Sequence, residues 1–345
     1  PRRKGCDMHP CRWILQHPTR PLSLWWLAAW VVIALIPLFL QAHWQLLAMQ
    51  ILIAICATVG LNLIVGNAGQ LVLSSAAFYA LGAYCYAHAA HLLGSFAAAI
   101  ILVIVVCTVA GLLIGLIATR LRGLYLAFVT LGFVLIMKEL VTNLRRWTGG
   151  AVGIPVDQVP ALPGMSMPGD TGLYVVIVTV VSLVVLVTAI LVRTTFGAAL
   201  DAIRSSDQLA ASLGINRQRT VSLAFAYSCA LAGVAGSMYA LSIGYLSPEP
   251  FGFDVTLLHM TIIVVGGLGS ILGSVSGAIV VCLLTEVLRG YPGVSEITYG
   301  IAIIFVLLIA RGGIVDIGRK IARSASQIRS TSPHSSEAVA QRGSA

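Results

Sequence analysis

Few side chains in this sequence could do chemistry, and none of them falls in a catalytic pattern. The three lysines, Lys4, Lys138 and Lys320, do not follow a glycine, so the chain has no GxxxxGKS/T loop to cradle ATP phosphates. The HExxH and GxSxG patterns of metalloproteases and hydrolases are absent. The seven cysteines form no CxxC pair, and we expect them to be small apolar packing residues. The sequence predicts neither an enzyme nor a metal site.

A charge-free stretch, GLNLIVGNAGQLVLSSAAFYALGAY at 60–84, carries neutral amides and hydroxyls among apolar and small residues. Such groups can pass a polar solute without trapping it, and glycines permit backbone breaks and close helix approach. The GGLGS cluster at 266–270 repeats this chemistry. The alternative is helix packing in which the amides cap backbone groups. The candidate translocation path consists of Asn62, Gln70, Ser74, Ser75, Gly266, Gly267 and Gly269.

The elements that must position these residues are membrane helices. The chain has 345 residues, of which 58% are hydrophobic and 10% charged, and its apolar runs reach the length of about 20 residues that a span needs. We expect ten spans, near 22–40, 44–65, 71–91, 95–119, 124–141, 172–192, 220–242, 255–268, 271–288 and 296–310. The third, eighth and ninth are the weakest, and a re-entrant segment could replace one of them.

Basic residues test this count, because cytoplasmic loops of membrane proteins carry an excess of Lys and Arg. With ten spans, all but four of the 21 basic residues fall on the side of the two termini. Both termini are therefore predicted to be cytoplasmic. The basic residues are scattered over several loops instead of forming a stripe, so no nucleic-acid partner is expected.

The longest cytoplasmic loop, residues 193–219, is predicted to be a folded arm of two short helices. Its sequence is RTTFGAALDAIRSSDQLAASLGINRQR, in which Phe196, Leu200 and Ile203 share one helix face. Ser205 is the expected N-cap of the second helix, and Gly214 the left-handed stop after it. An ordered arm on a chain without its own ATP site favours docking to an ATPase. The alternative is a solvated loop.

A carrier driven by protons or sodium is the alternative from a different class. Such carriers usually hold ionisable groups at mid-membrane, whereas Glu139 and Glu286 read as helix-end partners of nearby basic residues. His88, His91 and His259 could relay protons, but we favour hydrogen-bonded structural roles for them. Ion coupling therefore has weak support.

Several ordered motifs resemble the permease subunits of ABC importers of the branched-chain amino acid (LIV) family, M-type. They are FGAALDAIRSSDQLAASLGIN, GYLSPEPFGF and IIVVGGLGSILGSVSGA, together with the stretch at 60–84, TRLRGLYLAFVTLGF and TGGAVGI, across roughly residues 50–315. In that family an Ala-Ala-x-x-Gly element lies in the loop that docks to the ATP-binding subunit, which implies this role for Ala210, Ala211 and Gly214. The candidate docking loop comprises Asp201, Arg204, Asp207, Ala210, Ala211 and Gly214.

Departures from the family pattern bear on the cargo. The chain has Leu135 where relatives place Glu in the fifth span, and TGGAVGI where they read TGGPNGI. Asn67, Val72, Ser74 and Ser75 also differ from the usual GYAGQLSLGHAAF. Polar groups along the path distinguish solutes, so related amino acids, urea and short amides all stay open as cargo.

The sequence thus predicts an all-α integral membrane permease with a cytoplasmic segment at 1–21, a transmembrane domain at 22–315 and a cytoplasmic, disordered tail at 316–345. The resemblance implies a bacterial-type plasma (inner) membrane protein that assembles with a homologous second permease, two ATP-binding subunits and a soluble substrate-binding protein. The chain would bind no cofactor itself, and the partner subunits would use the ATP.

Overall fold

The computed structural model describes residues 42–121, 123–156 and 169–289. The chain divides into two compact units, Pro1–Gln45 and Leu46–Ala345. The described part of the first unit is the opening turn of one helix, and all contacts reported below lie within the second. The predicted spans at 22–40 and 296–310 and the tail at 316–345 lie outside the described residues.

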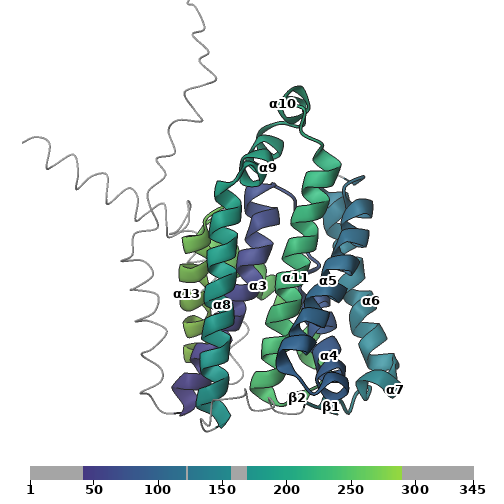
Figure 1. Ribbon diagram of the computed structural model, residues 1–345, viewed down its shortest axis with the longest axis vertical. Coiled ribbons are helices and arrows are strands. Elements are labelled where there is room, and N and C mark those ends of the chain that lie inside the picture. The colour runs from purple at the N-terminus through teal and green to yellow at the C-terminus, as the bar shows by residue number, and fades with distance from the viewer. Residues whose placement is uncertain (1–41, 122, 157–168, 290–345) are drawn as a thin grey trace, which may run out of the picture. The chain divides into compact units, whose positions relative to one another are not determined.

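Helices make up nearly all of the described chain (Figure 1). The long ones are α3 (Ala42–Asn62), α4 (Ser75–Leu93), α5 (Phe96–Ala118), α6 (Leu124–Asn143), α8 (Gly169–Arg193), α11 (Arg217–Ile243), α12 (Phe253–Gly266) and α13 (Ile271–Arg289). The short elements are the π-helix η2 (Leu63–Asn67), α7 (Arg145–Thr148), β1 (Ile154–Pro155), α9 (Thr195–Ser205), α10 (Asp207–Ser212), β2 (Tyr245–Leu246) and the 3-10 helix η3 (Glu249–Phe251).

Five helices in the described part are long and apolar enough to cross a membrane, or six if α12 and α13 count as one span. They are α3 with η2, α5, α6, α8 and α11. The α12–α13 pair bends by 118° at the glycine cluster, as expected of a broken span or a re-entrant loop. The ten-span count stays a prediction.

The third predicted span, 71–91, is shorter than expected. After η2 the backbone leaves the helix at residues 68–74, here called the unwound segment, and α4 begins only at Ser75. Gly69 has φ +66, a left-handed conformation that favours glycine. The break therefore falls where the sequence places its amides and hydroxyls.

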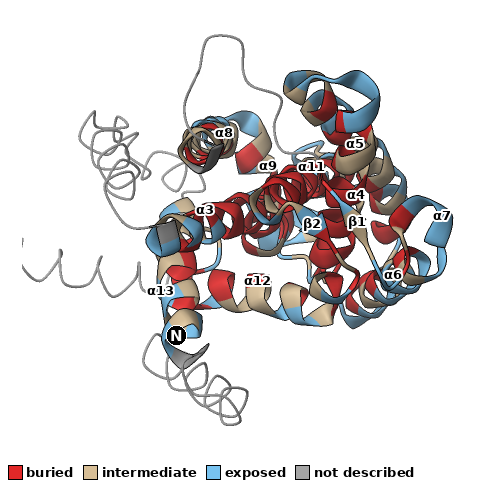
Figure 2. Cartoon of the chain, turned by 90° about the horizontal axis from the view of Figure 1, so that it is seen from below, coloured by how far each residue is buried: buried red, intermediate tan, exposed pale blue. Residues whose placement is uncertain are grey.

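Helix α11 lies at the centre of the described fold and packs against both α4 and α5 (Figure 2). Small residues let these backbones approach closely, as is common between membrane helices. A Cβ at Gly236 of α11 would lie 1.9 Å from the Tyr79 carbonyl oxygen of α4, and one at Gly82 of α4 would lie 2.1 Å from the Gly233 oxygen. The glycines therefore set the packing distance of α4 and α11.

The outer helices α5, α6 and α8 bury only a minority of their residues and expose large apolar side chains. Ile101, Phe128 and Leu183 are each at least 60% exposed. A face of this kind would be unfavourable in water and is suited to lipid or to another membrane subunit.

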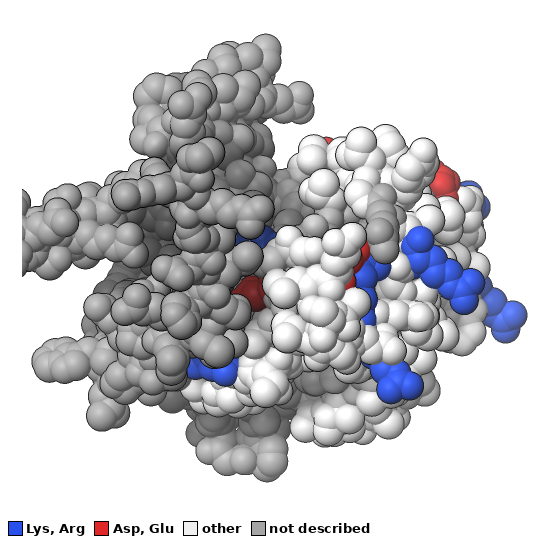
Figure 3. Space-filling view, turned by 90° about the horizontal axis from the view of Figure 1, so that it is seen from above, with Lys and Arg blue, Asp and Glu red and all other residues white. Residues whose placement is uncertain are grey.

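The two ends of the helices differ in structure and charge. Helices α9 and α10 lie at one end, the arm end, and α7 with the antiparallel pair β1–β2 lies at the other (Figure 1). The arm end carries Arg120, Arg193, Arg204, Arg217 and Arg219. Seen from that end, the basic side chains are dispersed over the described surface instead of forming a stripe (Figure 3).

Candidate functional site: the arm and the unwound segment

The arm is folded by its own caps. The side chain of Thr194 accepts a hydrogen bond from the Phe196 N–H at the start of α9, and that of Ser206 accepts one from Gln208 at the start of α10. The expected N-cap Ser205 is wrong by one residue: it is the last residue of α9, and its hydroxyl donates to the Asp201 carbonyl oxygen. Two adjacent serines made the cap ambiguous in sequence.

Gly214 ends α10 in the left-handed conformation that the sequence predicts, with φ +74. The Gly214 N–H donates to the Ala211 oxygen, and the Ile215 N–H donates to the Ala210 oxygen, both at 3.0 Å. These two bonds form a Schellman motif, which satisfies the last carbonyls of the helix. Ile215 also packs against the cluster that contains Ala210.

On the predicted amphipathic face of α9, Leu200 and Ile203 are buried as expected, whereas Phe196 is half-buried. Ile203 and Ala210 join Val221 of α11 in one cluster that holds the arm together. Two leucines of the arm lie outside this cluster and are exposed: Leu209 is 47% and Leu213 is 64% exposed. They lie one helical turn apart, so α10 presents an apolar surface at the tip of the arm.

Arg204 reaches from α9 to the end of η2, where its Nη1 donates to the Gly66 carbonyl oxygen. Glycines leave room for it. A Cβ at Gly69 would come 3.0 Å from the Arg204 Cγ, and one at Gly269 would come 3.3 Å from its Nη1. Nearby, the Asn67 side-chain amide donates to Asp201 Oδ1 at 3.4 Å. Two exposed residues of α9, Asp201 and Arg204, thus contact the start of the backbone break.

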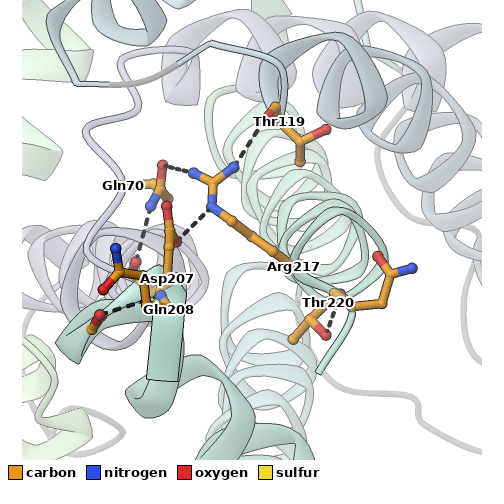
Figure 4. A network of polar contacts seen from close by, with 9 residues as sticks. Gln70, Thr119, Asp207, Gln208, Arg217 and Thr220 are labelled. Carbon is orange, nitrogen blue, oxygen red and sulfur yellow. Dashed lines mark hydrogen bonds and ion pairs between the residues drawn. The ribbon is translucent and has the colours of Figure 1, made fainter. Parts of the chain in front are cut away.

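Arg217 makes a second connection (Figure 4). Its Nε lies 3.0 Å from Asp207 Oδ1 of α10, and its Nη2 donates to the Gln70 Oε1 of the unwound segment at 3.3 Å. Its Nη1 donates to the Thr119 carbonyl oxygen at the end of α5 at 2.9 Å, where a cation also complements the helix dipole. One guanidinium therefore joins the arm, the unwound segment and α5.

The side-chain amide of Asn62 forms hydrogen bonds with residues at the turn between α12 and α13 and at the start of α13. Its Nδ2 donates to the Ser270 oxygen at 2.9 Å and to Ser274 Oγ at 2.8 Å, and its Oδ1 accepts from the Gly269 N–H at 2.8 Å. The backbones touch here as well, since a Cβ at Gly66 would lie 2.2 Å from the Gly269 nitrogen. This arrangement matches the capping alternative for Asn62.

Ser74 and Ser75 lie at the other end of the unwound segment, where α4 begins inside the described core. Both are buried, at 2% and 5% exposure. Ser75 Oγ lies 2.7 Å from His259 Nδ1 of α12, and the Ala76 N–H donates to Thr256 Oγ1 of the same helix at 3.2 Å. His259 therefore has a hydrogen-bonding partner on α4, as its structural interpretation requires.

The remaining path candidates form the turn after α12. Gly266 lies so close to α13 that a Cβ would be 1.9 Å from the Gly273 oxygen, and Gly267 and Gly269 have φ of +120 and +81. These glycines therefore have backbone reasons for their identity. Their role in a path stays a prediction.

The model of the family described as "Branched-chain amino acid transport system / permease component" matches residues 44–311. The chain belongs to this family. It is the permease subunit of an ABC importer and a multi-pass membrane protein. The family match lends no support to a carrier working without an ATPase.

Curated members of the family show how far the similarity extends. The chain is 32% identical over 297 residues to the high-affinity branched-chain amino acid transport system permease protein LivM of Salmonella typhimurium, covering 79% of this chain and 70% of that protein. LivH of the same kind of system in Escherichia coli is 30% identical over 148 residues, covering 42% and 48%. LsrC of Escherichia coli, an autoinducer 2 import system permease protein, is 28% identical over 188 residues, covering 50% and 53%. No solved structure matches.

Motifs that resemble those of the family, although far apart in the sequence, contact one another at both ends of the described permease. TGGAVGI supplies β1 and GYLSPEPFGF supplies β2, and Ile154 pairs with Leu246 at the end opposite the arm. At the arm end, the arm residues contact both the unwound segment and the glycine turn.

Within the candidate docking loop of this permease, the six residues divide into two groups. Ala211 and Gly214 are exposed and have no side-chain partner among the described contacts, whereas Ala210 is buried and Arg204, although exposed, contacts the end of η2. Asp201 and Asp207 likewise pair with residues of the permease core. Sequence reasoning missed Arg217. The Ala and Leu residues of 209–213 favour docking in sequence too, but Leu209 and Leu213 were not among the candidate residues, although their i, i+4 spacing was a usable signal.

Proposed function

We propose that this permease imports a small polar solute, with branched-chain or related amino acids as the first choice and urea or short amides as open alternatives. The observation that carries the proposal is the family match over residues 44–311, at 32% identity to a LivM protein. LivM is named for branched-chain amino acid transport, and LsrC, a more distant relative, for a different cargo. Two departures from the family pattern, Ser74 and Ser75, belong to the candidate translocation path, where a change of cargo would act.

The proposed assembly contains this chain, a homologous second permease, two ATP-binding subunits and a soluble substrate-binding protein. ATP would be consumed by the ATP-binding subunits, and this chain would hold no cofactor. The similarity to both LivM and LivH supports the pairing of two related permeases. Co-expression of the chain with ATPases and a permease encoded next to it should give one complex that co-purifies. Purification of a chain that transports without these subunits would contradict the assembly.

The proposed topology has ten spans in a bacterial inner membrane, with the arm and both termini in the cytoplasm. The basic residues at the arm end support this orientation, because cytoplasmic ends carry the Lys and Arg excess. Reporter fusions at Ser212 and Ser336 should give cytoplasmic signals, and a fusion near Pro163 an external one. Opposite compartments for Ser212 and Ser336 would refute ten spans.

The proposed docking surface for an ATP-binding subunit is the exposed tip of the arm, comprising Leu209, Ala211, Leu213 and Gly214. Exposed leucines at the cytoplasmic tip have no lipid to cover them, so a protein partner explains them best. A Leu213→Glu substitution should prevent co-purification of the ATP-binding subunits without loss of membrane insertion. Gln218→Glu, which adds the same charge at an exposed position of α11, is the matched control. Equal recovery of the ATP-binding subunits with both variants would exclude this surface.

A further inference from the structure

A short series of side-chain contacts runs from the docking tip to the buried start of α4. The series begins with Asp207 in the first turn of α10, directly beside the exposed tip. Asp207 pairs with the Nε of Arg217 at 3.0 Å. The Arg217 side chain is 19% exposed and that of Asp207 is 36% exposed, so the pair lies at the edge of the arm, with its arginine side turned inward.

The same guanidinium continues into the unwound segment. Its Nη2 binds Gln70 Oε1, and the Gln70 amide in turn donates to the Ala68 oxygen at 3.2 Å, as Figure 4 shows. Gln70 is thereby held between the arm and its own segment. Because the fork of an arginine has a fixed geometry, a displacement of Asp207 would be passed on to Gln70.

Beyond Gln70, the segment is anchored at two further points. The Leu73 N–H donates to Thr130 Oγ1 of α6 at 2.9 Å, and Ser75 meets His259 of α12. Only Leu71 and Val72 separate the Gln70 anchor from Leu73. Residues 71–74 are not part of a helix. The start of α4 at Ser75 can therefore move relative to Gln70 without the loss of helical hydrogen bonds in this segment.

Arg204 supplies an independent observation that the arm is built onto this break. It lies on α9, not on α11, and its Nη1 donates to the carbonyl oxygen of Gly66, two residues before the segment. Two arginines of the arm region, Arg204 and Arg217, therefore hold the two sides of residues 66–70. A solvated loop would not need either contact.

We propose that Arg217 is a positioning residue for transport: it couples the arm to the unwound segment, so that movement of the arm shifts the Ser75–His259 contact between α4 and α12. The proposal rests on the proposed docking of the arm to an ATP-binding subunit. Arg217 itself belongs to neither the docking surface nor the solute path.

The test uses the complete importer in proteoliposomes and measures solute imported per ATP hydrolysed. Arg217→Gln should leave co-purification of the ATP-binding subunits and basal ATP hydrolysis close to those of the unchanged protein, while solute per ATP falls at least tenfold. Arg217→Lys keeps a cation for Asp207 but loses the fork that also binds Gln70 and Thr119. It should give a smaller loss of the same ratio and serves as the readout if Arg217→Gln does not fold.

Arg219→Gln is the matched control, because Arg219 is exposed one half-turn away on the same helix. It should transport normally. Asp207→Asn should lower solute per ATP, and adding it to Arg217→Gln should lower the ratio no further, since the two residues act through one contact. An unchanged ratio in a folded and assembled Arg217→Lys complex, or an equal loss in Arg219→Gln, would overturn the proposal. Absence of ATP-dependent uptake in the unchanged complex would instead refute the proposed function.

Discussion

At the scale of single residues, Gly214 shows how one conformation shapes the arm. Its φ of +74 lies in the left-handed region, although no atom lies within 4 Å of where a Cβ would stand. Glycine is therefore required here by the backbone conformation and not by a lack of space for a side chain. Gly214→Val should destabilise the arm by about 1–2 kcal/mol, whereas Gly214→Asn should cost less because asparagine tolerates this conformation.

Co-purification of the ATP-binding subunits with the two Gly214 variants would check this expectation. We expect weaker recovery with Gly214→Val than with Gly214→Asn, although both side chains enter open space. Equal recovery with the two variants would show that the left-handed stop does not position the tip.

Asn62 gives a second residue-scale prediction. It satisfies the Gly269 N–H, the Ser270 carbonyl and the Ser274 hydroxyl at a buried site. Asn62→Leu should cost about 1–3 kcal/mol for each buried group left without a partner. The thermal unfolding midpoint in detergent should fall by several degrees. Asn143→Leu removes an exposed amide that bonds within its own helix, so it should change the midpoint little. Equal midpoints would contradict a structural role for Asn62.

At the scale of elements, the interface of α4 and α11 depends on glycine. A Cβ at Gly236 would stand 1.9 Å from the Tyr79 oxygen, so Gly236→Ala must push the two backbones apart, at a cost of about 1–3 kcal/mol or more. Gly132→Ala in α6 meets no atom within 4 Å and should be neutral. The yield of monodisperse protein in size-exclusion chromatography should separate the two variants. A normal yield for Gly236→Ala would refute close packing of α4 on α11.

Sequence patterns were sufficient to place most helices, because apolar runs of membrane length leave few alternatives. They also predicted the two-helix arm, since Leu200, Ile203 and Gly214 act through local periodicity and local backbone conformation. The contacts of Arg217 with Gln70 and of Asn62 with Ser274 join residues 147 and 212 positions apart. No local pattern encodes such pairs, so the polar stretch at 60–84 could be recognised while its partners could not.

At the scale of the whole molecule, the described part of the permease has outer helices with exposed apolar side chains, close helix contacts at small residues and a basic arm end. The chain belongs to a family of ABC importer permeases, and the proposed assembly supplies the ATP-binding subunits that would drive its movement. The arm end offers both a surface for that partner and two arginines that reach the backbone break. The central claim is that this chain forms an ATP-driven import path for a small polar solute.

The most direct test is uptake of radiolabelled leucine, isoleucine and valine by proteoliposomes that contain the complete complex, with the loaded binding protein outside and ATP inside. The account predicts accumulation that stops when the ATP-binding subunits carry a substitution that blocks hydrolysis. Urea and short amides, tested in the same way, identify the cargo among the open alternatives. Accumulation that persists with inactive ATP-binding subunits and follows an imposed proton or sodium gradient would contradict the account.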